Sequence, residues 1–471
     1  MTSSQTRMVV VGADAAGMSA AHQALRGARK RGRELDVVVL EKTQHTSYSA
    51  CGIPYWVAGD VSDPERLMAR SAAEHREMGV DLRMGATATQ VDLDQRTVSY
   101  VDASGTHRLH FDELVLATGA PPVIPEWARR EDGELVSGVH PLKNLDDGAV
   151  WLDLLGTGSP THRTGFRETR RAIVVGGGYI GIEMAEALIR RRWETTLLTR
   201  STVMSGLDPD MSERVQSAME AAGVEILPHT SVARLELRHD GSVSAVVTDD
   251  GRTLPADAVV LALGASPSSS LGADAGVPIG QFGGYLPDET GRVSEGVWAA
   301  GDCCEARHRI TGEFAFIPLG THANKQGRVV GENLTGGDVK FDGVLGTAIT
   351  RFVTKSQHVE IARVGLNSAE AADAGFDPAS LVTEGRTASG YMPEASPMAT
   401  KVVVDRISRR LLGLQIVGGQ GSGKRIDTAA AAIWGSMTVD DLAGMDLAYA
   451  PPFATVWEAV QLAARRLADR I

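Results

Sequence analysis

Cys51 is the residue of this chain best suited to covalent redox chemistry. It stands in the run SYSACGIPY, residues 47–55, with Gly52 next to it and Pro54 soon after. A flexible glycine and a proline with a fixed φ angle would hold the sulfur in a defined loop or at a helix start, where partial positive charge lowers the pKa of a thiol. A lone buried cysteine is more often a small apolar residue. The pattern that precedes Cys51 favours the redox role.

That pattern is a dinucleotide-binding fingerprint near the N-terminus. The apolar run 8–11 is followed by Gly12 and Gly17, an Ala-rich helical stretch, and a second apolar run, 36–40, that ends at Glu41. A strand, tight turn and helix of this kind place a pyrophosphate at the helix N-terminus, and the acidic residue accepts ribose hydroxyls. We expect a βαβ unit that binds a dinucleotide.

The same layout occurs a second time. The apolar run 172–175 leads into GGGYIG, residues 176–181, then a helix to about Arg192 and a strand over 195–198. One such motif is weak evidence, whereas two in the right context predict two dinucleotide sites. The alternative is a pair of glycine-rich turns without ligands. Two further runs, 114–117 before Thr118-Gly119 and 259–263 before Gly264, are expected to be strands whose ends approach a cofactor.

Length and composition set the frame for these motifs. The chain has 471 residues, 43% hydrophobic and 23% charged, with 52 glycines, which predicts about three globular domains. Its 47 Lys and Arg against 59 Asp and Glu give a net charge of −12, which argues against a general grip on nucleic acid. Three cysteines without metal spacing and no apolar segment long enough for a membrane predict a soluble, cytoplasmic protein without a metal.

The elements predict an α/β fold with two Rossmann-like dinucleotide-binding domains and a C-terminal α+β domain. In the last third, 401–417 alternates like strands, and 427–435 and 456–467 are helical in pattern. The polar stretch 156–170 is expected to be a linker. The predicted domains are 1–144 with 271–337, then 145–270, then 338–471.

Together these motifs resemble the FAD-dependent pyridine nucleotide-disulfide oxidoreductases over essentially the whole chain. The likeness includes both fingerprints, Thr118-Gly119, Gly301-Asp302 and the single Cys51, as well as KRID at 424–427 and YAPPF at 449–453. The last two motifs are similar to the dimerisation domain of the single-cysteine branch, which contains coenzyme A disulfide reductases, NAD(P)H persulfide or polysulfide reductases and NADH oxidases. The CxxxxC motif of the glutathione-reductase branch is absent.

The resemblance implies roles for particular residues. Those implied to hold FAD are Gly12, Ala15, Gly17, Glu41, Lys42, Thr118, Gly119, Gly301 and Asp302. Those implied to hold NADP are Gly176, Gly178, Tyr179, Ile180, Gly181, Arg200 and Gly264. Cys51 is the implied redox nucleophile, and Tyr449 and Tyr391 of the partner subunit would reach it in a homodimer. The alternative for both tyrosines is simple packing at an interface.

The nicotinamide preference depends on the end of strand 195–198. An acidic residue there usually binds the 2′-hydroxyl of NAD, whereas this chain has Thr199, Arg200 and Ser201. Loss of the carboxylate removes repulsion of a 2′-phosphate, and an arginine binds that phosphate bidentately. We therefore expect NADPH, with NADH as the less favoured cofactor. The alternative for Arg200 is a solvated surface charge.

The resemblance also implies a channel for a thiol substrate. The matching positions are Ser19, Gln23, Arg26, Ser47 and Asn324. Ala50 and Trp457 depart from the coenzyme A enzymes, which have Asn and Lys there. A basic run over 26–33 is suited to the phosphates of coenzyme A, or else to stabilising a helix C-terminus.

The expected activity is transfer of a hydride from NADPH, through FAD, to Cys51, which reduces a low-molecular-weight disulfide or persulfide such as coenzyme A disulfide. One alternative is an NAD(P)H oxidase that reduces oxygen through a Cys51 sulfenic acid. Another is a redox-sensing flavoprotein that binds a protein partner. Cys303 and Cys304 are expected to be structural, with a vicinal disulfide as their alternative.

Overall fold

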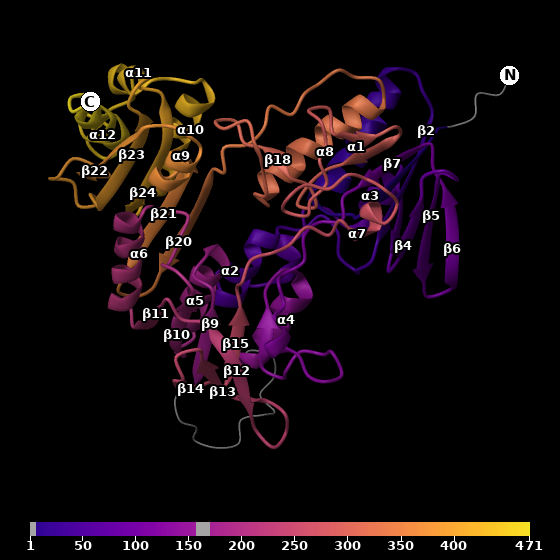
Figure 1. Ribbon diagram of the computed structural model, residues 1–471, viewed down its shortest axis with the longest axis horizontal. Coiled ribbons are helices and arrows are strands. Elements are labelled where there is room, and N and C mark those ends of the chain that lie inside the picture. The colour runs from indigo at the N-terminus through magenta and orange to yellow at the C-terminus, as the bar shows by residue number, and fades with distance from the viewer. Residues whose placement is uncertain (1–5, 157–169) are drawn as a thin grey trace. The chain divides into compact units, whose positions relative to one another are not determined.

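The computed structural model describes residues 6–156 and 170–471, and these form two compact units. Unit 1 comprises residues 1–53, 62–123 and 265–344, and unit 2 comprises residues 54–61, 124–264 and 345–471. Figure 1 follows the chain through both units. Each unit is described by itself below.

Unit 1 is built on a six-stranded sheet of order β16-β17-β7-β1-β2-β3. Its strands are β1 (Thr6–Val11), β2 (Leu35–Glu41), β3 (Asp81–Met84), β7 (Glu113–Leu116), β16 (Arg292–Ser294) and β17 (Val297–Ala299). All neighbours pair in parallel except β16 and β17. The central strands are continuously apolar and buried, as expected for a parallel sheet covered on both faces.

Two glycine-bearing helices pack tightly against each other in unit 1. Helix α1 (Ala15–Lys30) lies beside α8 (Gly320–Leu334), as Figure 1 shows. A Cβ atom added at Gly327 or Gly331 of α8 would overlap the backbone oxygen of Ala16 or Ala20 in α1. These glycines therefore allow a contact between helix backbones that other residues would hold apart.

The remaining elements of unit 1 are short. The strands β4 (Thr87–Asp92), β5 (Thr97–Asp102) and β6 (Gly105–His110) form an antiparallel sheet, and β18 (Ala306–Arg307) pairs with β19 (Phe314–Ala315). The helices are α3 (Ala72–Glu77) and α7 (Ser270–Ala273). Helix α2 (Ile53–Ala58) begins at the end of the first segment of unit 1 and continues into unit 2.

Unit 2 contains a second parallel sheet, of order β11-β10-β9-β15-β8. Its strands are β8 (Val139–Pro141), β9 (Arg171–Val175), β10 (Glu194–Thr199), β11 (Val224–Pro228) and β15 (Ala258–Leu261). Its helices are α4 (Leu145–Leu154), α5 (Tyr179–Arg190) and α6 (Pro209–Ala221). An antiparallel sheet of β12 (Val232–Leu237), β13 (Val243–Thr248) and β14 (Thr253–Pro255) accompanies it.

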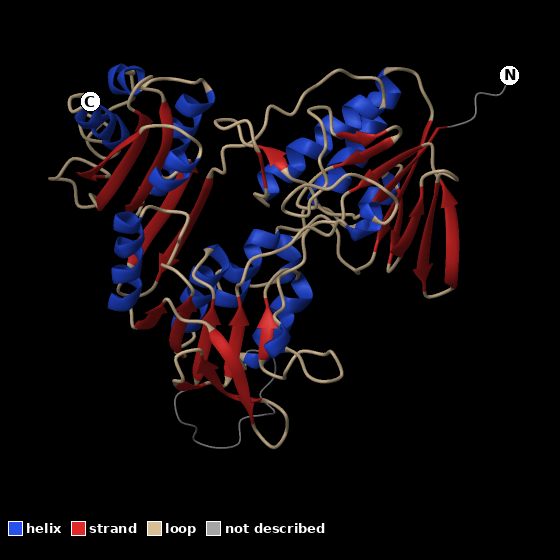
Figure 2. Ribbon diagram, in the orientation of Figure 1, coloured by secondary structure: helices blue, strands red, loops and turns tan. Residues whose placement is uncertain are grey.

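The C-terminal segment of unit 2, residues 345–471, forms an antiparallel sheet of order β20-β21-β24-β23-β22. Its strands are β20 (Ala348–Val353), β21 (His358–Gly365), β22 (Pro378–Arg386), β23 (Pro397–Asp405) and β24 (Leu411–Gly418). Its helices are α9 (Ser368–Asp373), α10 (Ile426–Trp434), α11 (Val439–Gly444) and α12 (Ala459–Ala468), of which α9, α10 and α12 contact the sheet (Figure 2).

The α/β fold class predicted from the sequence is confirmed, with two parallel nucleotide-type sheets and a C-terminal α+β part. The stretch 401–417 contains parts of two paired strands that are buried on both faces rather than one alternating strand. The predicted linker lies outside the described residues except at its ends, and the predicted domain boundaries stay a prediction. Within 6–156 and 170–471, no helix is long and apolar enough to cross a membrane.

The close contact between α1 and α8 predicts that one methyl group added at this contact lowers the stability of the fold. Gly331→Ala should lower the free energy of unfolding by about 1–3 kcal/mol, because the new Cβ overlaps the backbone of α1 and one helix must shift. Gly320→Ala is the matched control, since nothing lies within 4 Å of its added Cβ, and it should be neutral or stabilising. Thermal and denaturant unfolding of both variants measure this, and equal stability of the two would contradict the packing described.

Candidate active site

Four neighbouring strands of unit 1 end at residues predicted to bind FAD. Gly12 follows β1, Glu41 ends β2, Thr118 comes shortly after β7, and Gly301 comes shortly after β17. The four strands are parallel and consecutive in the sheet, so their carboxyl ends lie at one edge. The chain continues from β1 to β2 on one side and returns to β7 on the other, so the strand order reverses at β1. Open α/β sheets bind nucleotides at such a point. The structure thus gathers residues from 12 to 301 along one edge.

The turn after β1 has no room for side chains. Gly12 has a φ of 107°, and a Cβ added there would overlap the carbonyl oxygen of Ala117. A Cβ added at Gly17 would overlap the oxygen of Gly12. Both positions require glycine, and Ala15 starts α1 between them, so the helix N-terminus is open to a diphosphate. These residues fit the pyrophosphate of FAD.

Glu41 links the end of β2 to this turn. Its Oε2 accepts a hydrogen bond of 2.9 Å from the backbone N–H of Ala13, and its Oε1 accepts bonds from the N–H and the hydroxyl of Thr43, both 2.8 Å. The side chain is 9% exposed and oriented by these bonds, with lone pairs left for ribose hydroxyls. Lys42 beside it is exposed.

The other two strand ends are fixed by hydrogen bonds within unit 1. The hydroxyl of Thr118 donates to the carbonyl of Ser268, and Gly119 next to it has a φ of 70°. The N–H of Gly301 donates to Oε1 of Gln326 in α8 over 2.8 Å, which places the partly buried Asp302 after a fixed turn.

The segment before Cys51 is held by residues 67–69. The N–H of Ser49 donates to the carbonyl of Leu67, and the N–H of Ala69 donates to the carbonyl of Ser47, both over 2.8 Å. A 3₁₀ turn, Ala50–Gly52, then presents Cys51, whose side chain is exposed and forms no disulfide. The thiol is accessible on a well-anchored loop.

The second nucleotide turn repeats the geometry of the first in unit 2. Gly176 has a φ of 116°, and its added Cβ would overlap the oxygen of Ala262; a Cβ at Gly181 would overlap the oxygen of Gly176. Gly178 caps α5, which begins with Tyr179 and Ile180. Gly264, with a φ of 88°, follows the neighbouring strand β15.

Near this turn, the last residue of β10 is buried and the residue after it is exposed. Thr199 is 7% exposed, whereas Arg200 is exposed, and within the described residues no ion pair occupies it. The exposed guanidinium of Arg200 is therefore available to an anion at this edge of the sheet. Burial also raises the pKa of Tyr179 to about 12, so its hydroxyl stays protonated.

The residues predicted to line a thiol channel lie in unit 1 and are brought together in part. Ser19 donates to Oδ1 of Asn324 over 2.9 Å. Arg26 donates to Oε1 of Gln23 over 2.7 Å, one turn apart on α1. Ser47 lies on the loop of Cys51 instead, and its hydroxyl contacts the ring of a buried histidine described below. Within the described part of the chain, no hydrogen bond joins Ser47 to the other four residues.

The basic run 26–33 is largely engaged within unit 1. Arg31 forms an ion pair of 2.6 Å with Glu332 of α8, Arg33 donates to the carbonyl of Thr335 over 3.2 Å, and Arg29 donates to the carbonyl of Met78 over 3.3 Å. Most of these guanidinium groups therefore bind backbone carbonyls and one carboxylate at the ends of α1 and α8.

The two predicted tyrosines lie at the surface of unit 2. Tyr391 is 75% exposed and Tyr449 is 47% exposed. Phe453 and Val456 nearby in the chain are 75% and 70% exposed. Apolar exposure on this scale indicates a surface that another molecule covers. Cys303 and Cys304, by contrast, are buried in unit 1 with their sulfurs 3.9 Å apart, not joined in a disulfide.

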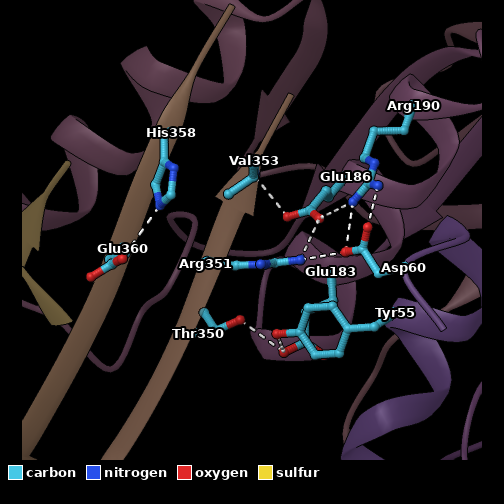
Figure 3. Close-up of polar contacts among 10 residues, drawn as sticks. All are labelled: Tyr55, Asp60, Glu183, Glu186, Arg190, Thr350, Arg351, Val353, His358 and Glu360. Carbon is cyan, nitrogen blue, oxygen red and sulfur yellow. Dashed lines mark hydrogen bonds and ion pairs between the residues drawn. The ribbon is translucent and has the colours of Figure 1, made fainter. Parts of the chain in front are cut away.

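Sequence reasoning missed a polar cluster in unit 2 that ties three elements together (Figure 3). Its members come from α2 and the residues after it, from α5, and from β20. They are Tyr55, Asp60, Glu183, Glu186, Arg190, Thr350, Arg351 and Val353. The signal was present in the spacing of Glu183, Glu186 and Arg190, which recurs along one face of a helix that is otherwise apolar.

The two glutamates of the cluster are held differently. Glu186 is 1% exposed and accepts bonds from the N–H of Val353 at 2.7 Å and from Arg190 at 3.1 Å. Glu183 accepts from the hydroxyl of Thr350 at 2.8 Å and lies 3.5 Å from the hydroxyl of Tyr55. Burial raises the pKa of Glu183 to about 7, so this carboxyl group titrates near neutrality.

The fold and these sites define a flavin- and nicotinamide-dependent oxidoreductase, and comparison with known families agrees. Residues 6–327 match the pyridine nucleotide-disulphide oxidoreductase family, and residues 353–460 match the dimerisation domain of that family. The chain belongs to the pyridine nucleotide-disulphide oxidoreductases, whose cofactors are FAD and a nicotinamide dinucleotide.

Individual relatives span the whole chain. A protein of Pyrococcus horikoshii described as an NAD(P)H coenzyme A polysulfide/persulfide reductase is 34% identical over 465 residues, 98% of each chain. The structure of an NAD-dependent persulfide reductase from A. fulgidus is 33% identical, with a TM-score of 0.90 over 99% of this chain and 83% of that one. An engineered water-forming NADPH oxidase, made from the water-forming NADH oxidase of Lactobacillus brevis, is 26% identical, with a TM-score of 0.89 over 99% of both chains.

The raised pKa of Glu183 predicts a pH-dependent stability. Because its folded pKa of about 7 exceeds the ordinary value of 4.5, the folded protein loses stability as pH rises from about 4.5 to about 7, where the unfolded chain has lost this proton and the folded chain retains it. Glu183→Gln removes this cost, so its melting temperature relative to wild type should be higher at pH 8 than at pH 5. The exposed Glu213→Gln serves as control and should give the same difference at both pH values. A Glu183→Gln difference independent of pH would contradict the assignment.

Proposed function

We propose that this protein is an NADPH-dependent flavoprotein reductase in which Cys51 reduces the disulfide or persulfide of a low-molecular-weight thiol. The observation that supports it most is a double anchor on Ala13, in the first nucleotide turn. Its N–H bonds to Glu41, and its carbonyl accepts a 2.5 Å bond from the hydroxyl of Thr46. Thr46 begins the Cys51 loop, so the same short segment fixes the proposed FAD turn and the exposed thiol.

The chemistry balances with one nucleophilic cysteine. The Cys51 thiolate attacks the S–S bond of the substrate, forms a mixed disulfide and releases one thiol. FAD, when bound, would take a hydride from NADPH and supply two electrons to a disulfide. With those electrons the mixed disulfide is cleaved, the second thiol leaves with a proton, and the Cys51 thiolate is restored. The sum converts NADPH, one proton and a disulfide into NADP⁺ and two thiols.

Coenzyme A is the proposed thiol carrier. The name of the Pyrococcus horikoshii relative supports this choice, and so does the polar face of α1, where Ser19 and Gln23 lie one turn apart. Ala50 and Trp457, which replace the Asn and Lys of coenzyme A enzymes, take an amide and a cation from the channel. The adenosine phosphates of coenzyme A would then bind more weakly here than in those enzymes.

We propose a homodimer formed through the C-terminal sheet and helices. The exposed Tyr391, Tyr449, Phe453 and Val456 support it, since a covered apolar surface explains their exposure in the single chain. In the dimer, the Tyr449 and Tyr391 hydroxyls would approach Cys51 of the other protomer. There they would donate hydrogen bonds to the departing thiolate.

NADPH is the proposed reductant because of the end of β10. The sequence there is Thr199-Arg200-Ser201, with a buried threonine and an exposed arginine. In the engineered NADPH oxidase, three consecutive residues, Asp-Ala-Met, were replaced by Ala-Arg-Ser, the same Arg-Ser order. An arginine without a neighbouring carboxylate favours a 2′-phosphate.

An NAD(P)H oxidase is the second candidate, favoured by the similarity to the oxidase structure over 99% of both chains. In that case a peroxide formed from oxygen would oxidise the Cys51 thiolate to a sulfenic acid, and two further electrons would return it to the thiolate and water.

Turnover without air separates these activities. Given NADPH and coenzyme A disulfide, other small disulfides or a persulfide, the wild-type enzyme should release thiol, and Cys51→Ser should lose at least about a thousandfold of that rate, because the nucleophile is gone. Cys304→Ala, which changes a buried thiol, is the control and should retain turnover. NADPH consumption only when air is admitted would assign the oxidase instead.

The proposed 2′-phosphate contact gives a separate prediction. Arg200→Ala should lower kcat/KM for NADPH about 10- to 100-fold, since a charge-assisted contact contributes about 1.5–3 kcal/mol, and should leave kcat/KM for NADH within about twofold. Arg171→Ala, an exposed arginine at the other end of the same sheet, should change neither value. Equal losses with both nucleotides in Arg200→Ala would contradict the contact.

A further inference from the structure

Two buried imidazole rings lie behind the loop of Cys51, both in unit 1. His22 belongs to α1 and His75 to α3, and Nε2 of His22 lies 2.7 Å from Nδ1 of His75. His75 is 0% exposed and His22 is 7% exposed. The second ring nitrogen of His75, Nε2, lies 2.9 Å from Oγ of Ser47. A chain of hydrogen bonds therefore connects α1, through α3, to the loop of the exposed thiol.

Ser47 is the residue of this loop that needs such support. Its φ is 50°, in the left-handed region, where a residue with a side chain is strained by about 1–3 kcal/mol. Two contacts hold it: the N–H of Ala69 donates to its carbonyl, and His75 bonds to its hydroxyl. Without the second contact the backbone at 47 is free to relax toward ordinary φ values, and the direction of the chain toward Cys51 changes with it.

The electrostatics around the pair keep both rings neutral at neutral pH. Burial is the main cause, and it lowers the pKa of His75 to about 4 and also lowers that of His22. Arg70 and Arg26 lower the pKa of His22 further. The His22 ring and Arg70 lower the pKa of His75 further, while Glu74 raises it. When both rings are neutral, one proton lies between Nε2 of His22 and Nδ1 of His75. Nε2 of His75 can then donate to the hydroxyl of Ser47 in one tautomer or accept from it in the other.

We propose that His75 is a positioning residue for Cys51: with its ring buried against that of His22, it holds Ser47 in its left-handed conformation and thereby fixes where the reactive sulfur lies. This rests on the redox role proposed for Cys51, and it adds a residue that need not touch substrate or cofactor. A reacting group displaced by about 1 Å loses up to about a hundredfold in rate, so a loop that relaxes at Ser47 lowers the reactivity of the thiol.

Two isosteric variants of His75 separate the hydrogen bond from the packing of the ring. In His75→Gln the side-chain amide takes the place of Nε2 and keeps the bond to Ser47. In His75→Asn the amide takes the place of Nδ1, keeps the contact with His22 and loses the bond to Ser47. His110→Gln, on the exposed strand β6 of the same unit, controls for loss of a histidine.

Two variants of Ser47 separate the backbone from the hydroxyl. Ser47→Ala removes the hydroxyl and keeps the strain, whereas Ser47→Gly also removes the strain, because glycine adopts positive φ freely. A role in packing alone predicts a greater loss from glycine, which deletes more atoms. A positioning role predicts that glycine restores reactivity that alanine loses.

The readout is the rate at which Cys51 attacks dipyridyl disulfide, followed by the release of thiopyridone from the FAD-loaded protein without NADPH. This step forms one mixed disulfide and releases one thiol, and the buried Cys303 and Cys304 are shielded from the reagent. His75→Asn and Ser47→Ala should be slower than wild type by about tenfold, His75→Gln should stay within about threefold of wild type, and Ser47→Gly should react faster than Ser47→Ala by about threefold or more. In the Ser47→Gly background, His75→Asn should have no further effect.

Unchanged reactivity in His75→Asn, or no recovery from Ser47→Ala to Ser47→Gly, would overturn the positioning role. Flavin content and melting temperature of each variant show whether it is folded, and if His75→Asn is not, the comparison of the two Ser47 variants decides. Because the assay uses no turnover, the positioning role can hold in a protein that fails to reduce coenzyme A disulfide, and that failure would count against the proposed function alone.

Discussion

The peptide groups of Ala13 are the point on which the proposed active site depends. Residue 13 is fully buried, its N–H is bound by the carboxylate at the end of β2, and its carbonyl is bound by a hydroxyl at the start of the Cys51 loop. A buried backbone group that lost its partner would cost about 1–3 kcal/mol, so these bonds are hard to break singly. The tight turn, the strand end and the thiol loop therefore keep one relative arrangement.

The two nucleotide turns share their steric logic and differ in their electrostatics. In each, the first glycine passes against the backbone of a neighbouring strand and the last one against the first. At the next strand end, however, unit 1 has the carboxylate of Glu41, whereas unit 2 has Thr199 and Arg200. A carboxylate accepts from ribose hydroxyls and a guanidinium binds a phosphate, which is why we propose FAD for the first site and NADPH for the second.

Glycine and strand patterns made the fold and the two tight turns predictable from sequence, because both are local. Gly12, Gly17, Gly176 and Gly181 identified the two turns, and parallel pairing then brought distant strand ends together. The contact of Glu183 with Thr350 and that of His22 with His75 join residues far apart in the chain, and no local pattern indicates such partners. Likewise, β23 and β24 are buried on both faces, so within 401–417 they lack the regular alternation of a half-buried strand.

The central claim is that electrons from the nicotinamide cleave a disulfide formed at Cys51. The number of NADPH equivalents that the protein consumes tests this claim most directly. The FAD-loaded enzyme is first allowed to form its mixed disulfide with coenzyme A, freed of excess disulfide, and then titrated with NADPH in the absence of air. Two electrons reduce FAD and two more cleave a disulfide, so about two equivalents per chain are expected for wild type and about one for a chain without Cys51. A wild-type enzyme that takes up only about one equivalent would contradict the claim.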